Sequence, residues 1–177
     1  MKLDQRSDNT SFREAFKKGN FTDKTALVLS SWFGAGLLPF APGTFGTLAA
    51  VAPVAVIKYL GGTAECLFIV ILVYLALWSS HVTRDCLVRD DPPEVVIDEA
   101  AGFCLSVFLL PLTILNLCLG FLLFRIFDIL KPYPIGMIDR RIKGGLGIVL
   151  DDIVAGAFAN IGARIILSLF FSLLPLR

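Results

Sequence analysis

The sequence of 177 residues contains few of the histidine and cysteine residues that many soluble binding sites use. It has a single histidine, His81, and four cysteines that show no CxxC or CxxxC spacing. Isolated cysteines of this kind are typical of small buried apolar side chains rather than of zinc sites or disulfides. The basic residues form no patch of one sign, and the formal net charge is only +1. The sequence therefore gives no indication of a zinc site, a disulfide framework or a nucleic-acid partner.

Charged residues are also almost missing from four apolar blocks, which cover residues 46–60, 64–80, 100–124 and 153–174. The chain is 56% hydrophobic, with a mean hydropathy of +0.77, whereas soluble domains are about 45–50% apolar. A membrane-spanning helix needs about 20 mostly apolar residues. The sequence therefore predicts an all-α, polytopic membrane helical bundle that includes short membrane helices. A polar N-terminal tail, residues 1–25, precedes a single membrane domain, residues 26–177.

The block 100–124 is compatible with two topologies. One straight span would put residues 124–152 on the opposite side of the membrane from the charged residues before them, whereas a hairpin bent at Pro111 would return them to the same side. Basic residues gather on the cytoplasmic side of membrane proteins. The hairpin places thirteen of the sixteen Lys and Arg residues on one side, and the straight span divides them eight against five. We therefore predict the hairpin, with Thr113 and Asn116 near its turn and the charged motifs gathered at the cytoplasmic face.

Acidic residues from three separate segments meet at one membrane edge in this topology. Carboxylates gathered in this way would form the oxygen-rich site that Mg²⁺ prefers. Ordinary ion pairs at the membrane interface are the alternative, with Arg125 and Asp128 as an i,i+3 pair on one helix. The predicted metal ligands are Asp98, Glu99, Asp128, Asp151 and Asp152.

Basic and hydroxyl side chains near these acids are candidate phosphate ligands. Arg offers a planar fork of donors and Lys a compact charge, although both also set topology and attract anionic headgroups. Residues 42–47, PGTFGT, place glycines before a helix N-terminus, where backbone N–H groups can meet an anion. Any helix breaker would look similar, and the segment lacks the Lys of a Walker A loop. The predicted phosphate-binding residues are Thr44, Thr47, Arg125, Lys131 and Arg140, and the predicted structural turns lie at Pro42, Gly43, Pro132 and Gly145.

The lone histidine, His81, is predicted to end a helix at the inner face of the membrane. It could relay a proton or protonate a leaving alkoxide, or it could simply complement the dipole of the helix C-terminus. The sequence leaves both interpretations open. His81, Asp128 and Asp152 form the predicted catalytic set.

Five motifs occur together in the order of a known family. GxGLLPxAPGTFGT (34–47), IDExxG (97–102), FRIFDILKPYPI (124–135), IDR (138–140) and GGLGIVLDDIVAG (144–156) resemble bacterial phosphatidylglycerophosphatase A, and His81 stands at a matching place. The resemblance implies that residues 26–177 are a membrane catalytic domain with a Mg²⁺ cofactor. It implies hydrolysis of phosphatidylglycerophosphate to phosphatidylglycerol and phosphate. It also implies a multi-pass protein of the bacterial cytoplasmic (inner) membrane, with an active site that faces the cytoplasm.

Motifs for a covalent phosphoenzyme are absent. The sequence has no DxDx[TV] motif and no Cys-x₅-Arg, and one histidine where type 2 phosphatidic acid phosphatases use two. We therefore predict direct attack by a water that a carboxylate orients or deprotonates. Two alternatives stay open. DDIVAGAFAN resembles the start of a CDP-alcohol phosphotransferase signature, although no acid follows Asp152. A small cation transporter or channel would more naturally place its acids at mid-membrane. The sequence leaves the oligomeric state open.

Overall fold

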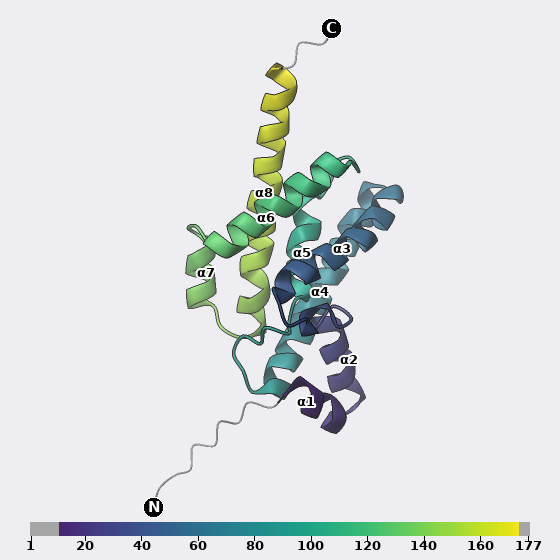
Figure 1. Ribbon diagram of the computed structural model, residues 1–177, viewed down its shortest axis with the longest axis vertical. Helices are drawn as coiled ribbons and strands as arrows, with labels where there is room; N and C mark the ends of the chain where they lie inside the picture. Colours follow the sequence, from purple (N-terminus) through teal and green to yellow (C-terminus); the bar gives the residue numbers. More distant parts are fainter. Residues whose placement is uncertain (1–10, 174–177) are drawn as a thin grey trace, which may run out of the picture.

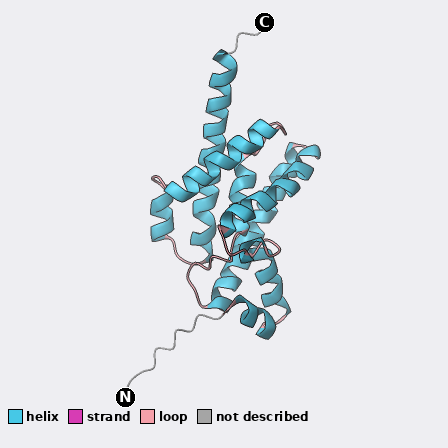
Figure 2. Ribbon diagram, in the orientation of Figure 1, coloured by secondary structure: helices cyan, strands magenta, loops and turns pink. Residues whose placement is uncertain are grey.

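The computed structural model describes residues 11–173, and this part of the chain is built of helices and loops without a strand (Figure 2). The predicted all-α class is therefore confirmed. In chain order the helices are α1 (Phe12–Lys18), α2 (Phe21–Ser30), the 3₁₀ turn η1 (Ala35–Leu37), α3 (Pro42–Tyr59), α4 (Gly62–Leu87), α5 (Ile97–Ser106), α6 (Ile114–Leu130), α7 (Ile135–Arg141) and α8 (Gly145–Leu173). The helix α8 is the longest, and its C-terminal half extends beyond the rest of the bundle (Figure 1).

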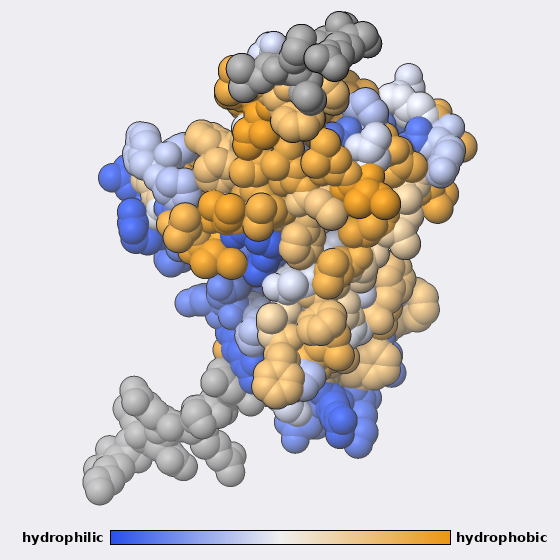
Figure 3. Space-filling model, turned by 45° about the horizontal axis from the view of Figure 1, so that its top comes forward, coloured by the Kyte–Doolittle hydropathy of each residue, from blue (hydrophilic) through white to orange (hydrophobic). Residues whose placement is uncertain are grey.

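Within the described residues, two helices are long and apolar enough to cross a membrane by length and composition, and these are α4 and α8. Only 28% and 22% of their apolar windows are buried inside the protein, so these helices do not resemble the covered core helices of a soluble domain. Figure 3 shows a broad apolar surface on the visible face, with hydrophilic residues beside and below it. The structure thus supports a helical protein with two candidate spans, which is coarser than the predicted polytopic bundle.

The apolar block 100–124 is divided between two helices. The helix α5 ends at Ser106, and α6 begins at Ile114. The Thr113 hydroxyl caps α6 by accepting from the Asn116 backbone N–H at 3.1 Å, and the Asn116 side-chain amide donates to the Pro111 carbonyl at 2.8 Å. The predicted bend at Pro111 is therefore confirmed, with its turn at the expected residues, whereas the return of the chain to the same side of a membrane stays a prediction. A helix of the length of α5 spans about 15 Å, roughly half the hydrocarbon thickness of a bilayer, so α5 is too short to cross one.

The helices α5 and α8 touch backbone to backbone. A Cβ atom added at Gly156 would collide with the Gly102 carbonyl, and one added at Gly102 would lie 2.6 Å from the Asp152 carbonyl. Small residues allow two helices to approach this closely. Gly102 follows Asp98 by one turn of α5, and Gly156 follows Asp152 by one turn of α8. This contact therefore sets the separation between the acids of the two helices.

The described part of the predicted N-terminal tail is helical. Ser11 caps α1, and the side chains of Asn20 and Asp23 cap each other's backbone N–H at the start of α2. Ala15 of α1 and Leu27 of α2 pack with Leu87 of α4. The helix α2 runs without interruption through the predicted boundary between residues 25 and 26. Residues 1–10 of that tail lie outside the described part of the chain.

Candidate functional site

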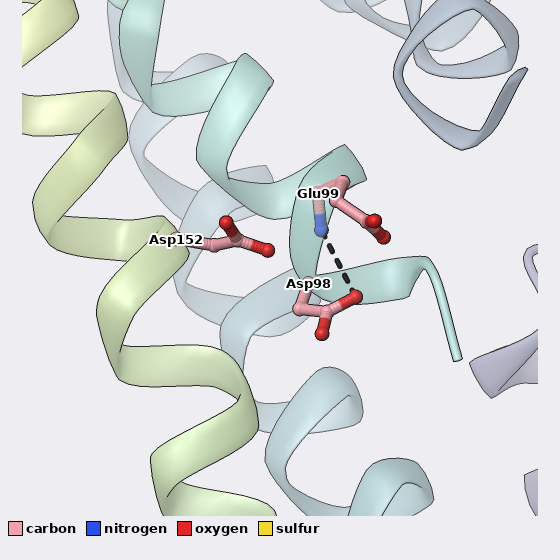
Figure 4. A group of neighbouring side chains, drawn as sticks. All are labelled: Asp98, Glu99 and Asp152. Carbon is pink, nitrogen blue, oxygen red and sulfur yellow. Dashed lines mark hydrogen bonds between the residues drawn. The ribbon is translucent and has the colours of Figure 1, made fainter. Parts of the chain in front are cut away.

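Three carboxylates meet where α5 and α8 are in contact, and two of them are buried while Glu99 is partly buried. Asp98 and Glu99 stand in the first turn of α5, and Asp152 points toward them from α8 (Figure 4). One oxygen of each carboxylate lies within 4.8 Å of the others. The Glu99 backbone N–H donates to Asp98 Oδ1 at 3.0 Å, and Asp98 and Asp152 are each only 5% exposed. We call these three residues the carboxylate cluster.

The start of α3 lies directly against this cluster. Pro42 is the first residue of α3, where its missing N–H costs no hydrogen bond. A Cβ atom added at Gly43 would collide with Glu99 Oε1 and would lie 3.2 Å from the Arg125 guanidinium. Glycine at this position therefore leaves room for the Glu99 carboxylate where it lies, and a larger residue would displace that carboxylate. Arg125 in turn forms an ion pair with Asp128, one turn later on α6.

The acids of this region are short of hydrogen-bond partners. Glu99 Oε2 and Asp151 Oδ1 are buried without a partner, and leaving such an atom unpaired costs about 1–3 kcal/mol. Burial, with added repulsion from Asp152 and Asp128, raises the pKa of Glu99 to about 8 although Arg125 opposes the shift. Burial and the neighbouring Glu99 also raise the pKa of Asp98. Unpaired carboxylate oxygens that repel one another fit the requirements of a hard divalent cation such as Mg²⁺.

A cavity of about 340 Å³ opens beside the cluster, and charged side chains of both signs line it. Its acids come from α5, α6, α7, α8 and the loop before α5, and its basic side chains come from the segment between α6 and α8. A phosphate bound together with a cation would find partners of both signs in this lining. The charged residues that line it are Asp90, Asp91, Asp98, Glu99, Asp128, Lys131, Asp139, Arg140, Lys143, Asp151 and Asp152.

Lys131 connects three elements at the edge of this cavity. Its ammonium donates to Asp139 Oδ1 and to Asp151 Oδ2, both at 2.7 Å, and so joins the end of α6 to α7 and α8. Burial lowers the pKa of Lys131, but the hydrogen bonds and charges of Asp139 and Asp151 outweigh it and raise the pKa overall. Lys131 is therefore a fixed positive charge. Its ammonium has three N–H donors, and these two contacts use two of them.

Comparison with known proteins identifies a matching family. A sequence model of the phosphatidylglycerophosphatase A family matches residues 28–167. The chain belongs to this family. The matched range includes the carboxylate cluster and every residue that lines the cavity. Phosphatase activity is therefore the activity class of this protein, as the motifs implied, and the comparison favours an enzyme over the transporter alternative.

Individual relatives agree with this assignment. Phosphatidylglycerophosphatase A of Escherichia coli strain K12 is 35% identical over 133 residues, which cover 75% of this chain and 77% of the relative. The protein of the same name from Haemophilus influenzae is 34% identical over 136 residues, covering 76% and 83%. A putative phosphatidylinositol-3-phosphatase of Bacteroides thetaiotaomicron is 32% identical over 143 residues, covering 76% and 89%. No solved structure matches the chain.

Most of the site residues predicted from the sequence lie at the cavity of this family member. All five predicted metal ligands line it, together with Lys131, Arg140 and Pro42. Arg125 stands behind the wall, between Gly43 and Asp128. The roles assigned to these residues stay predictions, because position alone does not test them.

Three further predicted residues lie apart from the cavity lining. The Thr47 hydroxyl is buried and donates to the Gly43 carbonyl of its own helix at 2.8 Å, and Thr44 is half-buried in the first turn of α3. His81 was predicted to end a helix, but α4 continues to Leu87, so that prediction is wrong. The His81 side chain is exposed, with Nε2 3.7 Å from Asp85 Oδ2. Its catalytic role stays a prediction that the structure does not favour.

The residues predicted to form turns around the site lie at or beside the ends of helices. Gly43 is helical, and the left-handed residue before α3 is Ala41. Gly144, with φ +83°, forms the bend before α8, whereas Gly145 opens α8 and packs on the His81 backbone. Pro132 follows α6 in the connector to α7.

Sequence reasoning missed the contact between Gly102 and Gly156 and the loop that carries Asp90 and Asp91. A signal for the glycines was present, because each follows an acid of the cluster by four residues in an otherwise apolar helix. Nothing in the local sequence distinguishes Asp90 and Asp91 from ordinary solvated loop acids.

Proposed function

We propose that the protein hydrolyses phosphatidylglycerophosphate to phosphatidylglycerol and phosphate, with Mg²⁺ held by the carboxylate cluster. The cavity carries this proposal, because its lining combines unpaired buried carboxylate oxygens with basic side chains. The substrate follows the names of the relatives from Escherichia coli and Haemophilus influenzae. The enzyme would act at the cytoplasmic face of a bacterial inner membrane as a multi-pass protein.

A lipid substrate suits the surroundings of the cavity. Ile129, Leu130 and Tyr133 flank Lys131 in the sequence, and their side chains are 68%, 72% and 80% exposed. Apolar side chains beside a charged cavity suit a molecule with a charged headgroup and acyl chains. The headgroup would enter the cavity from the membrane interface while the acyl chains stay in the bilayer.

We assign each role in hydrolysis to particular residues of the chain. Asp98, Glu99 and Asp152 would hold the cation, while Lys131 and Arg140 would bind the phosphate oxygens. Bound Mg²⁺ would neutralise negative charge on the phosphomonoester. Asp128, fixed by Arg125, would orient the attacking water and accept its proton. The products are inorganic phosphate and the lipid alcohol, whose oxygen regains a proton. His81 stays a predicted donor of that proton.

Phosphate release from defined lipids by the purified protein tests this proposal. We expect release from phosphatidylglycerophosphate in Mg²⁺, loss of activity in a chelator, and loss in Asp128→Asn and Asp152→Asn. Phosphatidylinositol 3-phosphate serves as the competing substrate, because a relative with a similar identity carries that name. Full activity in both variants would overturn the site. Preference for the inositol lipid would overturn the substrate while leaving the site intact.

A further inference from the structure

Four polar residues of three helices converge on the turn between α5 and α6, at the opposite end of α5 from Asp98. Lys58 lies at the end of α3 and Glu65 at the start of α4, and their side chains are only 4% and 11% exposed. Asn160 and Arg164 reach the same turn from α8. We call these four residues the turn clamp. The proposed reaction uses none of them.

Lys58 is fully occupied by this turn. Its ammonium donates to Val107 O and Leu110 O, both at 2.8 Å, and to Glu65 Oε2 at 2.9 Å. These three contacts use all three donors of a lysine. Glu65 Oε2 also accepts from the Leu109 backbone N–H at 3.1 Å. One ion pair therefore holds both carbonyl and N–H groups of the turn.

The opposite side of the turn is held from α8. The Asn160 amide donates to Ser106 O and Phe108 O, both at 3.0 Å. Arg164 donates to Phe108 O at 2.9 Å and to Asn160 Oδ1 at 2.8 Å. In a bilayer no water is present to satisfy such backbone groups. Two cations at the carbonyl end of a helix are also favoured by its dipole.

The carboxylate end of α5 is attached through its backbone rather than through its acids, because the Val96 N–H just before α5 donates to the Ser30 carbonyl of α2 at 2.8 Å. Within residues 11–173, neither Asp98 nor Glu99 forms an ion pair. The hydrogen bond to Asp98 Oδ1 comes from the adjacent Glu99 backbone. The positions of both carboxylates therefore depend on how α5 itself is held. The contact at Gly102 fixes its distance from α8, and the turn clamp ties its far end to α3, α4 and α8 together.

We propose that Lys58 and Arg164 are positioning residues for the carboxylate cluster. By fixing the far end of α5, they keep Asp98 and Glu99 at the separation from Asp152 that a divalent cation requires. The inference rests on the proposed function for the identity of the bound cation and for its activity readout. Cation binding by the protein without lipid tests it separately.

The experiment compares Lys58→Met and Arg164→Leu with Arg164→Lys in the full chain, purified in detergent. Lys24→Met is the matched control, since Lys24 lies on α2, away from the cavity lining and the turn. Mg²⁺ binding is measured by calorimetry without lipid, and kcat and KM for phosphate release are measured separately. We expect Lys58→Met and Arg164→Leu to weaken Mg²⁺ binding by about 10–100-fold, the range for residues that support metal ligands, and to lower kcat with little change in KM. Arg164→Lys should recover much of the loss.

Unchanged Mg²⁺ affinity and kcat in folded Lys58→Met would overturn the inference and leave the turn clamp a structural support only. If Lys58→Met fails to fold, Glu65→Gln and Arg164→Leu decide, because each leaves other contacts to the turn in place. Wild-type protein that binds Mg²⁺ but releases no phosphate would contradict the proposed function. Weakened Mg²⁺ binding in the two clamp variants would still support the positioning role in that case.

Discussion

The two ends of α5 differ in whether their buried polar groups have hydrogen-bond partners. At the turn, the Lys58 ammonium meets three acceptors, and the carbonyl groups of Ser106 and Phe108 receive side-chain donors. At the other end, Glu99 Oε2 has no partner, and Glu99 lies close to Asp98 and Asp152. Buried carboxylates without partners oppose folding, and the proposed cation would offset their repulsion. The polar side chains at one end of α5 are paired, and the acids at the other end are not.

The largest effect is expected at the carboxylate cluster, where a substitution should lower activity without lowering stability. We expect Asp152→Asn to lower phosphate release by roughly 1,000-fold, because several kcal/mol of charge stabilisation depends on the bound cation. Thermal unfolding without Mg²⁺ should occur at the same or a higher temperature, since the amide removes repulsion from Asp98. Lys58→Met should instead lower the unfolding temperature. Equal destabilisation by both variants would contradict the difference between the two ends.

The glycine contact between the two ends predicts the next largest effect. Gly156→Ala puts a methyl group against the Gly102 carbonyl, whereas a Cβ at Gly162 on the same helix meets Leu123 at an ordinary 3.5 Å. We expect Gly156→Ala to lower kcat on the order of 100-fold, because small displacements of reacting groups have effects of that size. Gly162→Ala is the control and should change kcat little. Similar kcat values in the two variants would show that the spacing of α5 and α8 is not critical.

The pKa of Glu99 predicts how Mg²⁺ binding depends on pH. Burial and repulsion raise this pKa to about 8 in the cation-free protein, so below that pH the cation must displace a proton. Apparent Mg²⁺ affinity should therefore fall by up to about tenfold for each pH unit below about 8, and should level off above it. Calorimetry across this range measures the slope. Glu99→Gln should reduce the slope, whereas Glu65→Gln at the turn should leave it unchanged. If Mg²⁺ affinity still depends on pH in Glu99→Gln, the displaced proton belongs to another group.

The smallest effect is expected at His81, which belongs to neither end of α5. Its exposed side chain lies near Asp85 and outside the cavity lining. We expect His81→Gln to change kcat by less than about threefold, because a general acid contributes about 10²–10⁴-fold only when it reaches the reacting group. The measurement is the pH dependence of kcat in both proteins. A large loss with an altered pH profile would restore the proton-donor role predicted from the sequence.

Local sequence signals were sufficient for the apolar helices and for the set of acids, but they did not predict the short helix α7. Pro111 and the Thr113 cap predict the hairpin because a proline and an N-cap act on adjacent residues. Charged side chains are so few between apolar helices that those present were reliable candidates for the cavity lining. His81 shows the limit of this reasoning, because the end of the apolar block before it predicts neither the end of α4, which lies at Leu87, nor the direction of the His81 side chain.

Sequence alone thus determined the apolar helices, the bend in the block 100–124 and the acids that line the cavity, because periodicity, breakers and scarce charges are local properties. Only the tertiary structure decided how close α5 and α8 come at Gly102 and Gly156. It also decided that Lys58 meets a turn 49 residues further along the chain. Such contacts depend on how helix surfaces pack at their crossings, and no short stretch of sequence specifies that geometry.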